Sequence, residues 1–302
     1  MAELLSGVDV FVAAVEAGGF AAAGERLHLT RSAVAKAIAR VEERLKVRLF
    51  HRTTRSLGLT EDGQIYYERC IRALEELRAG EAALESGRRV VAGRLRVTAP
   101  VLFGRRCVAP VLAALVAQHP NVELELSFND RPVDLINDGF DLAIRSGDIG
   151  DGAGLMTRAI SSERLTICGA PAYLAQHGRP ERLDDLARHT AIVYARAGRI
   201  RNWEFPAGER GAFVEATPPS RLRFDDAGAI ADAAEAGHGL ANLPNWLIRD
   251  RVRSGALIPL LTDAPGREIV THALWPATPH LPLRVRIAID ALAAALPGVT
   301  EL

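Results

Sequence analysis

Hydrophobic positions at the start of the chain recur at helical spacing in successive segments. The first stripe consists of Leu4, Val8, Phe11, Val12 and Val15, and Gly18-Gly19 ends it. Residues 20–27 are Ala-rich and predict a short second helix. After a turn at His28-Leu29, Thr30 is placed to cap a third helix that starts at Arg31. That helix carries an apolar stripe (Val34, Ile38, Val41, Leu45) with basic residues largely away from it, so the pattern predicts a helix-turn-helix.

A small hairpin and a long helix are expected next. Residues 49–52 and 57–59 predict the two arms of a wing whose tip holds Thr53, Thr54, Arg55 and Ser56. Thr60 is placed to cap a helix running to about Ser86, with acids in its first turn. Its narrow apolar seam consists of Tyr67, Cys70, Leu74, Leu77 and Leu84. Because a seam this narrow rarely covers a globular core, we expect it to pair with a second chain.

From Gly93 onward the pattern alternates between strands and helices. The expected strands are Leu95–Ala99, Val122–Phe128, Asp141–Arg145, Leu165–Gly169, Ala191–Tyr194, Leu222–Phe224 and Ile269–Trp275. The expected helices are Val108–Gln118, Val133–Asn137, Ala227–Ala236, Trp246–Arg253 and Leu283–Leu296. This alternation predicts an α/β region with largely parallel sheets. Roughly 210 residues are generous for one sheet, so we expect two lobes with a cleft between them.

Composition and charge agree with a globular protein that has a polyanionic partner at one end. The 302 residues are 48% hydrophobic and 25% charged, with a net charge of zero. The segment from Arg26 to Arg55, however, contains nine Lys and Arg residues and only two acids, so its net charge is +7. The remainder is mildly acidic, and this asymmetry favours nucleic acid as a partner of the first segment.

The sequence shows few features that indicate targeting, membrane insertion or redox chemistry. The first twenty residues carry acids and no basic segment, so we expect no signal peptide and a cytoplasmic protein. The longest uncharged apolar run, residues 107–117, is too short for a membrane span. Cys70, Cys107 and Cys168 lie far apart, and we expect buried, reduced thiols, with a redox switch as the alternative.

Several runs resemble the LysR-type transcriptional regulators. They are FVAAVEAGGF (residues 11–20), AAAGERLHLTRSAVAKAIARVEERL (21–45), RLFHRTTRSLGLTEDG (48–63), GRLRVTAP (93–100), DLINDGFDLAIRSG (134–147) and AEAGHGLANLPNWL (234–247). Together they span nearly the whole chain, and their order is more specific than any single run.

The resemblance implies an α+β multidomain architecture. Residues 1–60 would form a winged helix-turn-helix DNA-binding domain and residues 61–88 a linker and dimerisation helix. Residues 93–302 would form a bilobal, periplasmic-binding-protein-like effector domain, with one lobe at about 93–160 and 267–302 and the other at about 161–266. The implied partners are double-stranded DNA, a small-molecule effector, a second copy in a homodimer or homotetramer, and RNA polymerase. No cofactor, metal or membrane is expected.

The resemblance also implies which residues contact DNA. They are Thr30, Arg31, Ser32, Ala35 and Lys36 on the recognition helix, and Arg52, Thr53 and Arg55 on the wing. Three positions depart from the family pattern. Arg31 stands where Gln is usual, Ala35 where Ser is usual, and Lys46 replaces a glycine that ends the recognition helix. We expect Lys46 to adopt a left-handed conformation or the helix end to be remodelled.

The effector cleft is expected beyond the carboxyl ends of the strands. The candidates are Pro100, Val101, Phe128, Asn129, Arg145, Ser146 and Gly147 in one lobe, and Tyr194, Trp203, Asp226 and Ala227 in the other. Pro100 departs from the hydroxyl residue of many relatives. Arg145 suits a small carboxylate, and Phe128 and Trp203 suit an apolar or aromatic body. Asp226 disfavours an anion unless it is paired, and Arg145 could instead make a structural ion pair.

The sequence disfavours two other classes of protein. An enzyme is disfavoured because the sequence has no Gly-x-Ser-x-Gly, His-Glu-x-x-His or phosphate-loop motif. The run Gly150-x-Gly152-x-Gly154 lacks dinucleotide-binding spacing. A bilobal solute-binding protein is disfavoured by the helix-turn-helix and the absence of a secretion signal. The sequence therefore predicts a non-catalytic regulator whose effector is a small organic or aromatic carboxylate.

Overall fold

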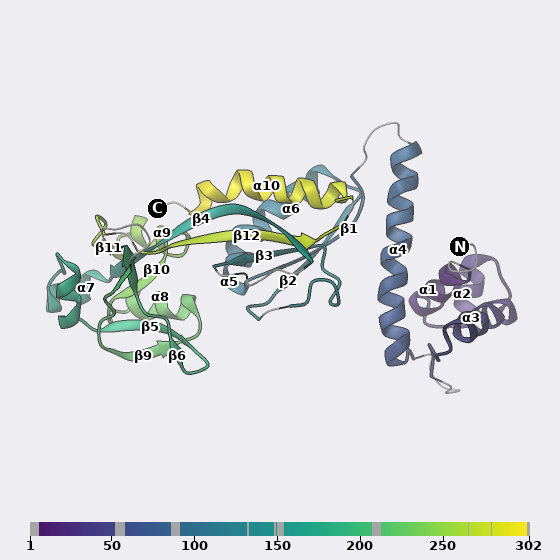
Figure 1. The fold of residues 1–302 in the computed structure, drawn as a ribbon, viewed down its shortest axis with the longest axis horizontal. Helices are drawn as coiled ribbons and strands as arrows, with labels where there is room; N and C mark the ends of the chain where they lie inside the picture. Colours follow the sequence, from purple (N-terminus) through teal and green to yellow (C-terminus); the bar gives the residue numbers. More distant parts are fainter. Residues whose placement is uncertain are drawn as a thin grey trace. The chain divides into compact units, whose positions relative to one another are not determined.

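The computed structural model describes residues 6–51, 58–85, 91–131, 133–147, 149, 154–206, 213–264, 266–278 and 280–300. The chain divides into two compact units, Met1–Arg94 and Leu95–Leu302 (Figure 1). The first unit is helical and the second is a mixed α/β structure. Each has its own buried core.

The first unit packs four helices around Phe11. They are α1 (Val8–Glu16), α2 (Phe20–Leu27), α3 (Arg31–Leu45) and α4 (Glu61–Glu85). The Phe11 ring is fully buried, and its centroid lies 5.5 Å from that of Phe50 and 5.4 Å from that of Tyr66. Phe11 therefore joins α1 to the segment after α3 and to α4. Such ring pairs stabilise beyond their buried area.

Local hydrogen bonds fix the ends of these helices as the sequence predicts. The Thr30 hydroxyl accepts the Ala33 N–H at 3.1 Å, and the Thr60 hydroxyl accepts the Gly63 N–H at 2.9 Å. Lys46 ends α3 with φ of 58°, which confirms the left-handed conformation expected where a glycine is usual. Phe50 and Leu59 form an antiparallel bridge, so the base of the hairpin is present.

A seven-stranded sheet forms the centre of the second unit. Its order is β10-β4-β12-β3-β1-β2, and β11 also pairs with β4. The strands are β1 (Gly93–Ala99), β2 (Val122–Phe128), β3 (Leu142–Ser146), β4 (Leu155–Gly169), β10 (Ala241–Pro244), β11 (Ile258–Leu260) and β12 (Glu268–Pro276). β1 and β3 are parallel, but β12 is antiparallel to both β3 and β4, and β10 and β11 are antiparallel to β4. The expectation of largely parallel sheets is therefore wrong, because β4 and β12 are two long strands that form a continuous antiparallel pair.

Helices cover one face of this sheet. A continuous helical run contains α5 (Val101–Phe103), the π-helical turn η1 (Gly104–Val108) and α6 (Ala109–Gln118). This run packs against α10 (Leu283–Thr300), and both lie over the strands (Figure 1). Among the described residues, Val101–Gln118 is the one run apolar and long enough to cross a membrane. It contacts β2 and α10, and 28% of this run is buried.

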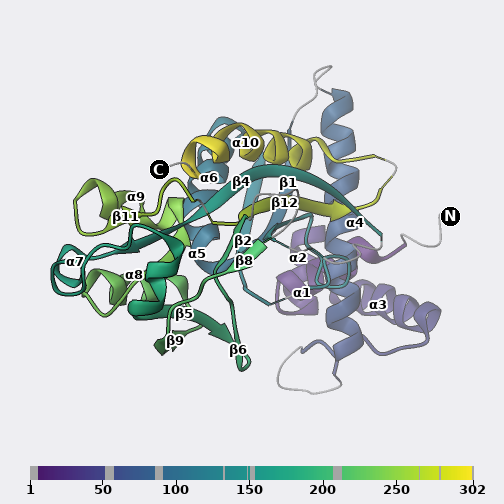
Figure 2. The same cartoon turned by 60° about the vertical axis from the view of Figure 1, so that its left-hand side comes forward.

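The second lobe is built on the far half of β4. It contains α7 (Pro171–His177), η2 (Leu183–Arg188), α8 (Ala227–Glu235) and α9 (Asn245–Arg253). A three-stranded sheet has the order β6 (Arg199–Ile200), β5 (Ala191–Arg196), β9 (Ser220–Phe224), and β7 (Glu204–Pro206) pairs with β8 (Phe213–Glu215). Figure 2 shows β4 and β12 running between the two lobes. The helix expected at Val133–Asn137 is wrong, because residues 135–139 form turns closed by the Asp134 carboxylate, which accepts the Ile136 and Asn137 N–H groups.

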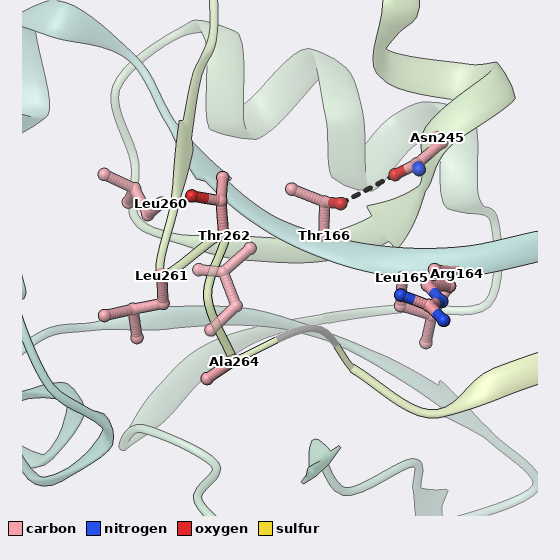
Figure 3. A pocket seen from close by; sticks show the side chains of 9 residues that line it. Arg164, Leu165, Thr166, Asn245, Leu260, Leu261, Thr262 and Ala264 are labelled. Atoms are coloured by element: carbon pink, nitrogen blue, oxygen red, sulfur yellow. Dashed lines mark hydrogen bonds between the residues drawn. The ribbon is translucent and has the colours of Figure 1, made fainter. Parts of the chain in front are cut away.

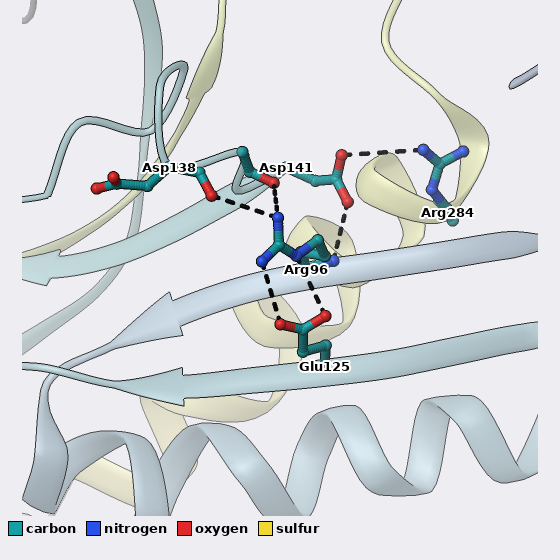
Figure 4. A network of polar contacts seen from close by, with 6 residues as sticks. Arg96, Glu125, Asp138, Asp141 and Arg284 are labelled. Carbon is teal, nitrogen blue, oxygen red and sulfur yellow. Dashed lines mark hydrogen bonds and ion pairs between the residues drawn. The ribbon is translucent and has the colours of Figure 1, made fainter. Parts of the chain in front are cut away.

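Hydrogen bonds of Arg96 connect several segments of the first lobe (Figure 4). Its guanidinium donates to both oxygens of Glu125 at 3.2 Å and to the Gly139 carbonyl at 3.0 Å. Its backbone N–H donates to Asp141 at 2.8 Å, and Arg284 of α10 lies 3.8 Å from the same carboxylate. One arginine therefore connects β1, β2 and the turn before β3, while Asp141 connects that turn to α10.

The close approach of α4 to the hairpin generates a stability prediction. A Cβ on Gly63 would lie 2.0 Å from the Leu49 carbonyl oxygen, whereas a Cβ on Gly19 would meet nothing within 4 Å. We expect Gly63→Ala to lower the free energy of unfolding of the first unit by about 3 kcal/mol. Gly19→Ala, the matched control, should cost about 1 kcal/mol or less. Urea unfolding followed by circular dichroism measures both, and equal costs would contradict the packing described.

Candidate DNA-binding surface and effector site

The recognition helix α3 buries one side and exposes the other. Val34, Ile38 and Val41 are buried in the core of the first unit. The predicted contact residues Thr30, Arg31, Ser32 and Lys36 are exposed, and Ala35 is half-buried. The exposed N-terminal half of α3 thus presents cationic and small polar groups together, which is the arrangement that base and phosphate contacts require.

The turn before α3 is held in one conformation. His28 adopts a left-handed conformation with φ of 55°, and the Leu29 N–H donates to the Gly24 carbonyl at 2.8 Å. A Cβ on Gly24 would lie 2.6 Å from the Leu29 carbonyl oxygen, so a glycine is required there. The wing residues Arg52, Thr53 and Arg55 lie outside the described residues.

The apolar seam on α4 was expected to be free for pairing with a second chain, and this holds for only part of it. Cys70 is buried in the core of the first unit, and Tyr67 and Leu74 pack against that core. The expectation that Cys70 pairs with a second chain is wrong, because α1 covers this part of α4, whereas Tyr67 and Leu74 are half-buried and their pairing stays a prediction. Leu77 lies one turn further on and is 49% exposed. The side chain of Leu84 lies outside the described residues.

Several predicted effector residues of the first lobe meet around Asp130, which the sequence did not single out. The Asp130 carboxylate accepts the Val101 N–H at 2.9 Å, next to Pro100 at the start of α5. The Asn129 N–H donates to the Ala99 carbonyl at 2.9 Å. Phe128 is exposed and covers Gly104, where a Cβ would lie 2.7 Å from its ring.

Arg145 and Ser146 lie at the end of β3. The Arg145 guanidinium donates to the Ile144 carbonyl at 2.7 Å and to the Thr98 hydroxyl at 3.2 Å. Burial lowers its pKa, and the charge of Asp130 opposes that shift. Within the described part of the chain, no acid lies at ion-pair distance from Arg145, so the expected alternative of a structural ion pair is not found there. The Ser146 hydroxyl is 2.7 Å from that of Thr271 on β12.

A cavity of about 680 Å³ lies beside these strands. Of the predicted residues only Gly147 lines it; the others are Leu165, Ile200, Arg201, Asn202, Glu204, Glu215, Arg267, Glu268, Ile269, Val270 and His272. His272 pairs with Arg145 across β12 and β3, so the two side chains point to the same face of the sheet. Arg145 therefore lies next to the cavity wall. The buried Nδ1 atom of His272 has no hydrogen-bond partner among the described residues.

Most charges that line this cavity already have partners. Arg267 donates to Glu204 at 2.9 Å, Asn202 donates to Glu215 at 2.8 Å, and Ser162 donates to Glu268. Arg201 makes no ion pair within the described ranges, although its charge lowers the pKa of Glu163. The cavity residues are spread over β4, β6, β7, β8 and β12 and the loops beside them, and no motif in the sequence marks them as a group.

The predicted residues of the second lobe have structural contacts. Trp203 is 3% exposed and packs with Phe205 in the lobe core, which corrects the prediction that its indole faces the cleft. The Asp226 carboxylate caps α8 by accepting the Ala229 N–H at 2.7 Å. Tyr194 and Ala227 are half-buried against the core of the same lobe.

A smaller cavity of about 220 Å³ lies within the second lobe (Figure 3). It is lined by Arg164, Leu165, Thr166, Ile167, Asn245, Leu260, Leu261, Thr262 and Ala264. The Thr166 hydroxyl donates to the Asn245 amide oxygen at 2.6 Å across it. These two polar groups therefore satisfy each other.

The three cysteines are buried and unpaired, as expected. Burial raises the pKa of Cys107 and of Cys168 to about 12. The thiolate needed for oxidation is therefore scarce at neutral pH at these two positions.

Glu163 on β4 is a buried carboxyl that the sequence did not single out. Its side chain is 5% exposed, and its Oε2 atom has no hydrogen-bond partner in the described part of the chain. Burial raises its pKa to about 7, while the Trp246 indole N–H and the charge of Arg201 oppose the rise. Glu163 is thus a buried carboxyl whose pKa lies near neutral pH.

The helix-turn-helix and the two-lobed α/β unit together define a transcriptional regulator with an effector-binding domain. Residues 5–64 match the family model "Bacterial regulatory helix-turn-helix protein, lysR family", and residues 88–297 match "LysR substrate binding domain". The chain belongs to the LysR family of bacterial transcriptional regulators. Such regulators bind DNA and small-molecule effectors and form oligomers, and they are not enzymes.

Named relatives and solved structures agree with this assignment. The chain is 32% identical to an HTH-type transcriptional repressor of Pseudomonas aeruginosa (strain UCBPP-PA14), over 95% of this chain and 90% of that one. It is 30% identical to the HTH-type transcriptional activator AaeR of Escherichia coli (strain K12), over 96% and 93%. The structure of CrgA from Neisseria meningitidis is similar with a TM-score of 0.61 and 29% identity, covering 96% of this chain and 98% of that one.

Glu163 generates a pH prediction. Its pKa of about 7 in the folded chain exceeds the ordinary value of 4.5, so the unfolded chain loses this proton first as the pH rises. The second unit should therefore lose about 3 kcal/mol of stability from this group between about pH 4.5 and 7. Glu163→Gln should remove that loss. Urea unfolding at several pH values measures it through Trp203, Trp246 and Trp275, which are the three tryptophans of the chain. Identical pH dependence in the two proteins would refute the burial argument.

Proposed function

We propose that this regulator binds an operator through α3 and changes its DNA binding when a small organic or aromatic carboxylate enters the cleft between its lobes. The observation that carries the effector class is Arg145, a cation beside a large cavity with no acid at ion-pair distance in the described ranges. The proposal divides the chain into residues 1–60 for DNA binding, 61–88 for linking and dimerisation, and 93–302 for effector binding. It places the protein in the cytoplasm, with RNA polymerase as a further partner.

The DNA contacts would come from the exposed start of α3. Arg31, Ser32 and Lys36 would reach base edges and phosphates in the major groove, with Thr30 and Ala35 beside them. Arg52, Thr53 and Arg55 would contact the backbone or the minor groove. The exposure of the α3 residues and the fixed turn before them support this assignment.

Two guanidinium groups near the cleft are available to an anionic ligand, although Glu215 and Glu268 in the same cavity accept hydrogen bonds from the neutral side chains of Asn202 and Ser162. Arg145 and Arg201 make no ion pair among the described residues, whereas Glu204 and Glu215 are each engaged by a neighbour. Ile200, Leu165 and Ile269 supply apolar lining for the body of an organic acid. A carboxylate would therefore find both a cation and an apolar wall.

A footprint tests the proposed function. DNA upstream of the gene for this protein and its neighbours would be probed with wild type and Arg145→Gln, with and without benzoate, 4-hydroxybenzoate or pyruvate. We expect a carboxylate to alter the wild-type footprint, while Arg145→Gln keeps the ligand-free footprint and loses the response. A neutral sugar or a diamine serves as comparison. A response to those compounds, and to no carboxylate, would overturn the proposed effector class.

Arg31 generates a prediction about base preference. An arginine can donate two hydrogen bonds to guanine O6 and N7, whereas the usual glutamine suits adenine. We expect a guanine opposite Arg31 in each half-site, and Arg31→Gln should change that one base at a cost of about 1–3 kcal/mol for the original site. Selection from a random duplex library measures the preference. Unchanged selection by the variant would show that Arg31 does not contact that base.

We expect the outer part of α4 to form the dimer contact. Leu77 is 49% exposed, whereas Leu74 packs on the core of its own unit. We expect Leu77→Glu to weaken dimers by at least tenfold without unfolding the first unit, because a charge cannot be buried unpaired at an interface. Leu74→Glu should instead unfold that unit, and Ile65→Glu, at a 55% exposed position, should do neither. Sedimentation that finds the Leu77→Glu dimer intact would exclude this contact.

A further inference from the structure

The basic segment that contains the recognition helix holds two acids, Glu42 and Glu43, and they differ in environment. Both belong to the last turn of α3. The Glu42 side chain is 10% exposed, whereas Glu43 is exposed to solvent. The charge count of the sequence treats the two acids alike, so the burial of Glu42 calls for a separate explanation.

The Glu42 carboxylate binds the segment that follows α3. Its Oε1 atom accepts the Leu49 N–H at 2.8 Å and the Phe50 N–H at 3.3 Å. Its Oε2 atom accepts a hydrogen bond at 2.8 Å from the guanidinium of Arg48, whose side chain is 58% exposed. Leu49 and Phe50 are buried, so without Glu42 their N–H groups would lose a partner that water replaces poorly. The two backbone bonds therefore contribute more than the exposed ion pair.

The same segment is held from its other side by the start of α4. The Thr60 hydroxyl donates to the Arg48 carbonyl at 2.5 Å, and the Thr60 N–H donates to the Leu49 carbonyl at 3.0 Å. The hairpin continues directly from there, because the His51 N–H donates to the Gly58 carbonyl at 2.9 Å. The base of the hairpin is thus fixed between the end of the recognition helix and the start of the long helix.

The turn that leads from α3 into this segment has little local support. Lys46 is in the left-handed region with φ of 58°, which is unfavourable for a residue with a Cβ. The Glu42 carboxylate closes this turn by bonding to residues seven and eight positions further on. Phe50 can then pack edge-on against Phe11 of α1 and Phe20 of α2. Glu42 therefore supplies a connection that the turn residues do not supply themselves.

We propose that Glu42 is a positioning residue for operator recognition, which fixes the base of the hairpin against the recognition helix through the Leu49 and Phe50 N–H groups. Glu42 does not contact DNA in this role. It keeps the contacts of α3 and those of the hairpin in one relative placement, so that both fit a single DNA site. Selectivity for the operator then depends on the reach of the Glu42 side chain and not on its charge. This inference rests on the proposed DNA contacts of the first unit.

Variants at Glu42 that separate reach from charge test the proposal. Glu42→Gln keeps an oxygen that can accept both N–H groups but removes the charge, whereas Glu42→Asp keeps the charge on a side chain too short to reach them. Selectivity is the affinity of the full-length protein for a selected operator divided by its affinity for a scrambled duplex of equal length. We expect Glu42→Gln to stay within about threefold of wild-type selectivity, and Glu42→Asp and Glu42→Ala to lose at least about tenfold, because misplaced base contacts act as mismatches do.

Substitutions of Glu43 are the matched controls. Glu43→Gln and Glu43→Ala remove the same charge from the same turn of α3, so they should change both affinities equally and leave selectivity as it is. A simple loss of stability lowers the active fraction for both duplexes, and the ratio is insensitive to it. Wild-type selectivity in Glu42→Asp, or selectivity in Glu42→Gln as low as in Glu42→Ala, would overturn the proposal. A wild type that does not prefer its operator would instead refute the proposed DNA contacts.

Discussion

The burial of Phe11 is the interaction on which the DNA-binding unit depends. Its ring contacts Phe50 beyond α3 and Tyr66 and Tyr67 on α4, so one side chain connects α1, the base of the hairpin and the long helix. Gly63 allows the α4 backbone to approach Leu49 closely enough for these contacts to form. With one side of α3 buried in this core, the basic side of the recognition helix remains exposed in a fixed orientation.

The effector unit follows from a different constraint, the long antiparallel pairing of β4 with β12. Residues Glu268–Pro276 pair along β4 from Arg164 back to Leu155, so the same two strands serve both lobes. Polar groups at the ends of the neighbouring strands are therefore brought to one place. Asp130 comes from the first lobe and Arg196 from the second, and the Arg196 guanidinium donates to the Asp130 carbonyl.

Local features of this fold were predictable from sequence, and long-range ones were not. The caps at Thr30 and Thr60 and the conformation of Lys46 depend on neighbouring residues only, and the structure confirms them. The spacing on α4 showed that Cys70 would be buried, but spacing does not identify the covering surface. Likewise, the sequence suggested Arg145, yet its pairing with His272 joins strands more than a hundred residues apart.

The exposed face of α3 is the surface that we expect to bind DNA in a sequence-specific manner. The most direct test of this binding is the affinity of the full-length protein for a selected operator and for a scrambled duplex of equal length, at about 50 and 200 mM salt. We expect both affinities to fall steeply with salt and the operator to bind at least about a thousandfold more tightly than the scrambled duplex at the higher concentration. Equal affinity for the two duplexes, or affinities that do not change with salt, would contradict this expectation.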